Sequence, residues 1–150
     1  MDQRRLHELE EQCIQDCDPP CTSRCPVHVD VRQMCKEISA GDFKRALITF
    51  QKSVPFPEII ARTCDQPCQA LCNREPLGGA IRMADLELAC CQLGMEESLL
   101  SPVTGRKNAL VAVIGGGLCG MTAAWELARK GYRIVLFDQA EQLGGRLWGL

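Results

Sequence analysis

In the first hundred residues, apolar positions recur at intervals of three and four, which is the spacing of one helix face. The clearest set would face a core from a single helix and comprises Phe43, Ala46, Leu47 and Phe50. Asp42 precedes this set and can cap a helix over Phe43–Gln51, because a carboxylate at that position accepts hydrogen bonds from free amides. Further short helices are expected over Gln3–Gln12, Val31–Ala40 and Ala80–Leu93, with a turn over Glu58–Arg62.

The ends of these predicted helices carry residues that are typical of helix caps. Asp30 can cap the helix over Val31–Ala40, and Gly41 suits the left-handed position that follows it. Gly94 would stop the last of these helices. Residues 1–100 are therefore expected to form a helical domain.

The pattern changes after Ser101–Asn108, which has the composition of a linker. Ala109–Ile114 and Arg133–Phe137 are short apolar runs suited to buried parallel strands, and Met121–Lys130 between them is helical. Residues 109–150 thus read as one βαβ unit, the beginning of an α/β, Rossmann-like domain. Two strands and one helix cannot cover their own apolar faces, so the rest of this domain is expected from further chain or from another chain.

Composition narrows the function. The net charge of −2 and the interspersed basic and acidic residues leave no basic stripe for nucleic acid. No apolar run approaches the roughly 20 residues of a membrane span, and the polar start has no signal-peptide pattern, which favours the cytoplasm. Aromatic residues make up only 5% of the chain, so additional stabilisation from metal or disulfides is expected.

The cysteines indicate which of these two sources of stabilisation to expect. There are 11, and seven form two evenly spaced groups: Cys13, Cys17, Cys21 and Cys25, followed by Pro26, and then Cys64, Cys68 and Cys72. Bacterial two-cluster ferredoxins hold [4Fe–4S] clusters with such a run ending in Cys-Pro, whose last cysteine serves the other cluster. By that logic Cys25 would join the second group in one four-thiolate site, and the other three cysteines would need a fourth ligand. Structural zinc and disulfides are the alternatives.

The two cysteine groups, the stretch VDVRQMCKEISAGDFKRAL and the segment GGAIRMADLE resemble the N-terminal cluster domain of the glutamate synthase small subunit and of dihydropyrimidine dehydrogenase-like flavoproteins. The resemblance covers the whole chain and implies two [4Fe–4S] clusters. It also implies that a helix residue completes the first cluster, which places Asp85 as the ligand, with Glu87, Cys90 and Cys91 as competitors. The family usually has gaps of two and four in its first three cysteines, whereas both gaps are three here. Cys35 is expected in the core rather than at a cluster.

A glycine motif follows the first predicted strand. Gly115, Gly117 and Gly120 form GxGxxG between a strand and a helix, the context in which the motif binds a dinucleotide pyrophosphate. Asp138 ends the second strand, where an acid can bond a ribose hydroxyl. The nearby Gly144, Gly145 and Arg146 resemble the GGR signature of flavoproteins, which implies FAD.

The expected function is electron transfer. In the proteins that the chain resembles, NAD(P)H reduces FAD, and the clusters carry electrons to a partner subunit or second centre. No residue is expected to act as a catalytic acid, base or nucleophile. The alternative is a docking module of a larger oxidoreductase, in which iron–sulfur clusters or zinc only hold the shape.

Overall fold

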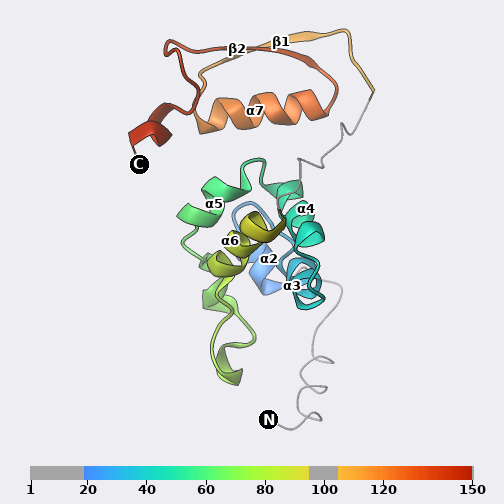
Figure 1. Ribbon diagram of the computed structural model, residues 1–150, viewed down its shortest axis with the longest axis vertical. Coiled ribbons are helices and arrows are strands. Elements are labelled where there is room, and N and C mark those ends of the chain that lie inside the picture. Colours follow the sequence, from blue (N-terminus) through green and yellow to red (C-terminus); the bar gives the residue numbers. More distant parts are fainter. Residues whose placement is uncertain (1–18, 95–104, 150) are drawn as a thin grey trace.

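A computed structural model describes residues 19–94 and 105–149 of the chain. They form a helical region (19–94) and a βαβ region (105–149), as Figure 1 shows. The helix expected over Gln3–Gln12 and most of the expected linker lie outside the described residues. No helix within the described ranges is long and apolar enough to cross a membrane.

The helical region consists of short helices joined by tight turns. In chain order they are α2 (Pro20–Arg24), α3 (Val31–Ser39), α4 (Phe43–Ser53), α5 (Pro57–Thr63), the 3₁₀ helices η1 (Pro67–Leu71) and η2 (Glu75–Leu77), and α6 (Met83–Gly94). Helix α4 packs against α3 and α6, and α5 packs against α6. The side chains completely enclosed between these helices are Phe50, Met34, Met83, Val29, Val54 and Cys90.

The predicted caps of α3 and α4 are confirmed. Asp30 Oδ1 accepts a hydrogen bond from the Gln33 amide at 3.0 Å, and Asp42 Oδ1 accepts one from the Arg45 amide at 3.0 Å. Helix α6 begins at Met83 instead of Ala80. Its start is bonded from outside the helix: Gln66 Oε1 accepts from the Ala84 amide at 3.2 Å. A local sequence pattern cannot predict a hydrogen-bond partner that lies 18 residues away in the sequence.

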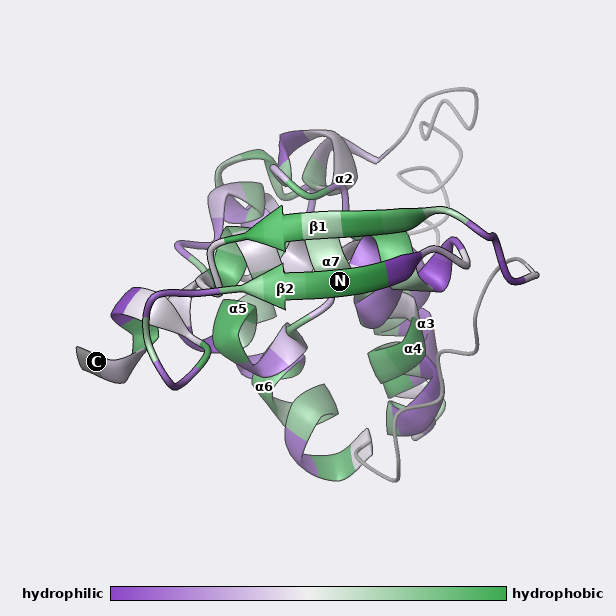
Figure 2. Ribbon diagram, turned by 90° about the horizontal axis from the view of Figure 1, so that it is seen from above, coloured by the Kyte–Doolittle hydropathy of each residue, from purple (hydrophilic) through white to green (hydrophobic). Residues whose placement is uncertain are grey.

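The βαβ region has the predicted order of β1 (Leu110–Ile114), α7 (Leu118–Arg129) and β2 (Arg133–Phe137), followed by the 3₁₀ helix η3 (Gly145–Gly149). The two strands are parallel, and Figure 2 shows them as apolar ribbons lying side by side. Helix α7 packs on one sheet face, and alternate strand residues are half-buried. The other face is open to solvent, with Ile114 88% and Phe137 54% exposed.

Candidate functional site

All the cysteines that the structure describes are free thiols. Two short helices carry those of the two sequence groups. Cys21 lies in α2 and Cys25 ends it, while Cys68 lies in η1 and Cys72 ends it. The two helices pack against each other, and Cys64 at the end of α5 leads into η1. The fold thus brings together every described cysteine of the two groups; Cys13 and Cys17 lie outside the described residues.

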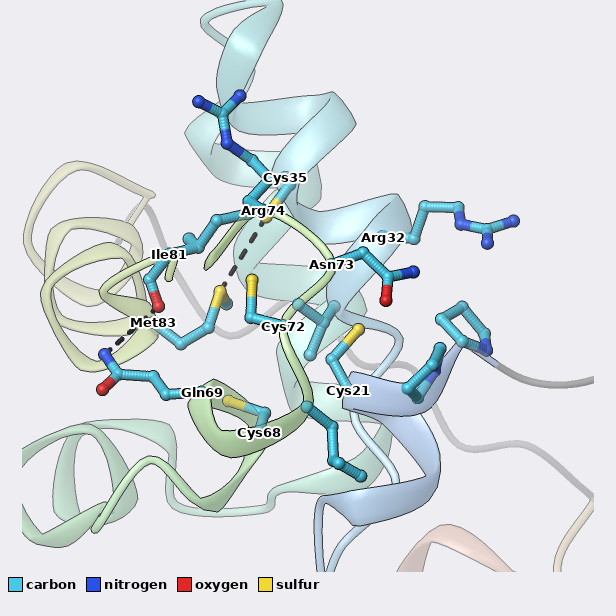
Figure 3. Close-up of a pocket in the computed structure, with 14 residues that line it drawn as sticks. Cys21, Arg32, Cys35, Cys68, Gln69, Cys72, Asn73, Arg74, Ile81 and Met83 are labelled. Atoms are coloured by element: carbon cyan, nitrogen blue, oxygen red, sulfur yellow. Dashed lines mark hydrogen bonds between the residues drawn. The ribbon is translucent and has the colours of Figure 1, made fainter. Parts of the chain in front are cut away.

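Cys21 and Cys72 border a cavity of about 220 Å³ between α2, α3 and η1, whose lining also includes Cys35, Cys68 and Met83 (Figure 3). Burial raises the pKa of the Cys21 thiol, and the nearby Cys72 raises it further. The Cys21 and Cys72 thiols are therefore close enough to interact electrostatically at one side of this cavity.

A second neighbourhood surrounds Cys64. Burial raises the pKa of its thiol, and Glu87 and Cys25 raise it further. Burial also raises the pKa of Cys68 to about 11, with Cys64 as the next contributor and Glu87 adding to it. Cys64 and Glu87 thus both disfavour a negative charge on Cys68, which places three potential ligand groups in one neighbourhood.

Glu87 is the unexpected member of this set. It lies on α6, is only 5% exposed and hydrogen-bonds the Cys64 thiol, while burial raises the pKa of its carboxyl group. The second carboxylate oxygen, Oε2, is buried without a hydrogen-bond partner. A buried carboxylate with an unpaired oxygen is costly, and ligation of a metal centre is a natural way to offset that cost.

Asp85, the ligand predicted from the sequence, points elsewhere. Its carboxylate is 58% exposed and forms a salt bridge of 2.8 Å with Arg82. Two positions along an α-helix are about 200° apart, so Asp85 and Glu87 face nearly opposite directions. Of the candidates named from the sequence, Glu87 therefore lies beside Cys64 and Asp85 does not.

Cys72, which the sequence groups with Cys25, Cys64 and Cys68, also has neighbours from the first group and from α3. Cys72 contributes to the raised pKa of the Cys21 and Cys35 thiols. Because η1 is a 3₁₀ helix with three residues per turn, side chains four positions apart along it point in different directions. In Figure 3 the sulfur atoms of Cys68 and Cys72 point in different directions.

Gln66 links the cysteine loop to α6. Its backbone is left-handed (φ +53°), a conformation that non-glycine residues adopt at a cost. The Gln66 amide bonds the Cys64 sulfur and lowers the pKa of that thiol. The side-chain Oε1 accepts from Gln69 Nε2 at 2.8 Å and from the Ala84 amide. One residue thus fixes Cys64 relative to the helix that carries Glu87, and no motif in the sequence indicates it.

The remaining candidates are less involved. Cys90 and Cys91 are buried in the core, and Cys35 is half-buried beside the cavity. His28 is exposed in a left-handed turn, with Nδ1 3.3 Å from the Thr22 carbonyl oxygen. Within residues 19–94 and 105–149, no three His, Cys, Asp or Glu side chains converge closely enough to hold a single metal ion.

The glycine motif forms the turn between β1 and α7. Gly115 has φ +103°, and a Cβ on Gly120 would lie 1.7 Å from the Gly115 carbonyl oxygen, so neither position accommodates a side chain without distortion. A Cβ on Gly117, in contrast, would meet no atom within 4 Å. The backbone of the loop is tightly packed where strand and helix meet. At Gly117 there is free space, and a ligand can approach the backbone there.

Asp138 and the GGR segment meet this loop. The Asp138 carboxylate accepts hydrogen bonds from the Ala140 amide at 2.7 Å and from the Gly116 amide, and these bonds lower its pKa. The Gly144 amide donates to the Gly116 carbonyl oxygen at 2.8 Å. Gly145 follows at the same edge, and the Arg146 side chain is exposed. The predicted residues therefore gather at the carboxyl ends of both strands, where open α/β sheets bind ligands.

Comparison with known proteins divides the chain at the same place. Residues 1–99 match the family model for dihydropyrimidine dehydrogenase domain II, 4Fe-4S cluster, and residues 113–147 match that for the NAD(P)-binding Rossmann-like domain.

Three relatives show the range of the matches. The chain is 32% identical over 148 residues to the glutamate synthase [NADPH] small chain of Azospirillum brasilense, covering 95% of this chain and 31% of that protein. It is 32% identical over 157 residues to the NADP(+)-dependent formate dehydrogenase subunit beta of Moorella thermoacetica (85% and 21%). It is 26% identical over 121 residues to the NADPH-Fe(3+) oxidoreductase subunit beta of Geobacter sulfurreducens (79% and 18%).

The chain thus matches less than a third of the length of each of these relatives. The family match covers the helical region together with the cysteine residues that precede it. On this evidence the chain belongs to the dihydropyrimidine dehydrogenase domain II family of 4Fe–4S proteins, with the start of an NAD(P)-binding Rossmann-like domain after the cluster domain.

Proposed function

We propose that this chain is the electron-transfer part of an NAD(P)H-linked flavoprotein oxidoreductase, with two [4Fe–4S] clusters in the helical domain and FAD on the glycine loop. The observation that carries the proposal is the presence of two thiol neighbourhoods on the same pair of short helices. Cys21 and Cys72 belong to one and Cys25 to the other, while Cys68 borders both. A single structural metal site would need only one such neighbourhood.

The structure supports a division of the ligands that differs from the sequence prediction. One cluster would be held by Cys25, Cys64, Cys68 and Glu87, because Cys25 and Glu87 both act on Cys64, and Cys64 and Glu87 both act on Cys68. The other would be held by Cys72 and Cys21 together with Cys13 and Cys17. When bound, such clusters supply one-electron redox chemistry.

The protein's own residues would fix the positions of the two clusters. Cys21 and Cys25 lie on consecutive turns of α2, so their two sites are neighbours, and α2 is held against η1. The Gln66 amide donates to the Cys64 sulfur, and such hydrogen bonds tune a cluster's potential. The helices that surround Glu87 exclude water from its side of the site.

On the glycine loop, the open backbone at Gly117 and the amides at the start of α7 would receive a dinucleotide pyrophosphate. Asp138 is at the end of β2, where an acid can bond a ribose hydroxyl. The GGR segment from Gly144 favours FAD as the occupant. NAD(P)H as the electron source is supported by the NADPH and NADP(+) in the relatives' names.

The proposed partners are the remainder of the flavoprotein and further oxidoreductase subunits. The exposed sheet face around Ile114 and Phe137 is apolar, as expected of a sheet that further chain would cover. The relatives named as a small chain or a subunit beta are consistent with assembly into larger complexes.

The test is the amount of iron, acid-labile sulfide and zinc per chain after purification without oxygen. Two clusters predict about eight iron atoms and eight sulfides. About four of each would mean that one site does not hold a cluster. Zinc without sulfide would contradict electron transfer and leave the alternative of a metal-stabilised docking module.

A further inference from the structure

Cys35 is a thiol that neither proposed cluster uses. It belongs to neither cysteine group but lies on α3, at the second turn after the Asp30 cap. Its side chain is half-buried and borders the same cavity as Cys21 and Cys72 (Figure 3). The cavity is therefore bordered by thiols from three elements: Cys21 of α2, Cys35 of α3, and Cys68 and Cys72 of η1.

The electrostatics of Cys35 agree with this placement. Burial raises the pKa of its thiol, and Cys21 and Cys72 raise it further. The Cys35 thiol donates a hydrogen bond to the Met83 sulfur at a distance of 3.8 Å. Thioethers are weak acceptors, so a contact of this kind gives little resistance to a change of partner.

We propose that Cys35 is a reserve ligand of the cluster at this cavity, able to replace Cys72 or Cys21 on iron. The inference rests on the proposed function, because it requires a cluster there. In the replacement one Fe–S bond to the original thiolate is lost and one to Cys35 forms. The Cys35 proton passes to the departing thiolate or to water, and no electrons are transferred.

The buried cysteines on α6 provide the contrast. Cys90 is completely buried and Cys91 is 5% exposed, and neither borders the cavity. Burial raises the pKa of Cys90 to about 12, with Cys91 as the next contributor. They are core residues of the same chemical type, so Cys90 is a matched control for Cys35.

The experiment measures iron and sulfide in the full chain purified without oxygen, for Cys72→Ala alone and combined with Cys35→Ala or Cys90→Ala. Wild type and the single Cys35→Ala variant should hold about eight iron atoms. Cys72→Ala should also hold about eight, with an altered electron paramagnetic resonance (EPR) signal after reduction. Adding Cys35→Ala should halve the iron to about four, and adding Cys90→Ala should not.

About four iron atoms in Cys72→Ala alone would overturn the inference, as would about eight in the Cys72→Ala/Cys35→Ala double variant. The Glu87 cluster reports on folding, because a chain that does not fold loses both clusters. If Cys72→Ala loses all its iron, the series is repeated with Cys21→Ala, and complete loss there too would overturn the inference. A wild-type chain without two clusters would instead refute the proposed function.

Discussion

Glu87 on α6 hydrogen-bonds Cys64 at the end of α5, and the other oxygen of the same carboxylate is buried without a partner. A carboxylate among thiols gives the proposed site a mixed ligand set. Because ligand type and net charge are main determinants of cluster potential, the two clusters should differ in potential. The difference in potential would favour an electron residing on one cluster over the other.

Replacing Glu87 with Ala should remove one cluster and reduce the iron from about eight atoms to about four per chain. Asp85→Ala is the matched control on the same helix, and it should keep both clusters. The Arg82–Asp85 salt bridge is exposed, and such pairs contribute about 0–1 kcal/mol. Iron and sulfide analysis checks both, and loss of a cluster in Asp85→Ala alone would restore the ligand predicted from the sequence.

Glu87→Gln should keep both clusters if the amide oxygen ligates in place of the carboxylate. It removes one negative charge from the site, so the potential of one cluster should rise while the other stays unchanged. A redox titration followed by EPR measures this. Equal shifts of both clusters would show that Glu87 acts through general charge and not through ligation.

Much of this fold was accessible from the sequence, because its signals are local. Asp30 and Asp42 each bond an amide three residues ahead, and the βαβ order follows from apolar runs on either side of a glycine motif. The cluster ligands were harder to assign. Glu87 and Asp85 are close in sequence, and only the direction of α6 separates them.

Gln66 shows the same limit more clearly. The role of Gln66 depends on its hydrogen bond with the Ala84 amide and on its left-handed backbone. Secondary-structure propensities predict neither feature. Similarly, the different directions of the Cys68 and Cys72 side chains depend on η1 being a 3₁₀ helix. The pattern of residues could not predict contacts between segments that are distant in sequence. It also could not predict whether a short helix is α or 3₁₀.

Gln66→Ala should destabilise the helical domain by about 0.5–2 kcal/mol, the usual range for loss of a helix cap. Gln66→Gly also loses the cap, but glycine tolerates the positive φ, so its destabilisation should be smaller. Chemical denaturation without oxygen, followed by cluster absorbance, compares the two. A glycine variant less stable than the alanine variant would show that the left-handed backbone is not a significant strain.

Gly120→Ala should destabilise the βαβ region by about 1–3 kcal/mol, because the added methyl group overlaps the Gly115 carbonyl oxygen. Gly117→Ala should keep the fold, since that side is open, but should weaken binding of added FAD. Amide spectra test the fold, and equilibrium dialysis tests the binding. Unchanged FAD binding in Gly117→Ala would place the pyrophosphate elsewhere.

Asp138→Ala should accelerate hydrogen exchange at the Gly116 and Ala140 amides several-fold, because both donate to this carboxylate. Those bonds hold the pKa of Asp138 below its ordinary value of 3.8, so their stabilisation is lost only as the pH falls below that value. The effect of the substitution should therefore be constant near neutral pH. An effect that fades toward pH 6 would assign the protection to another group.

The central claim is that the helical domain carries electrons through two clusters. The most direct measurement is a reductive titration of the full chain without oxygen, followed by EPR. Two reversible one-electron centres are predicted, of which Glu87→Gln shifts only one. A chain that contains metal but shows no reversible reduction would contradict electron transfer and establish the metal as structural.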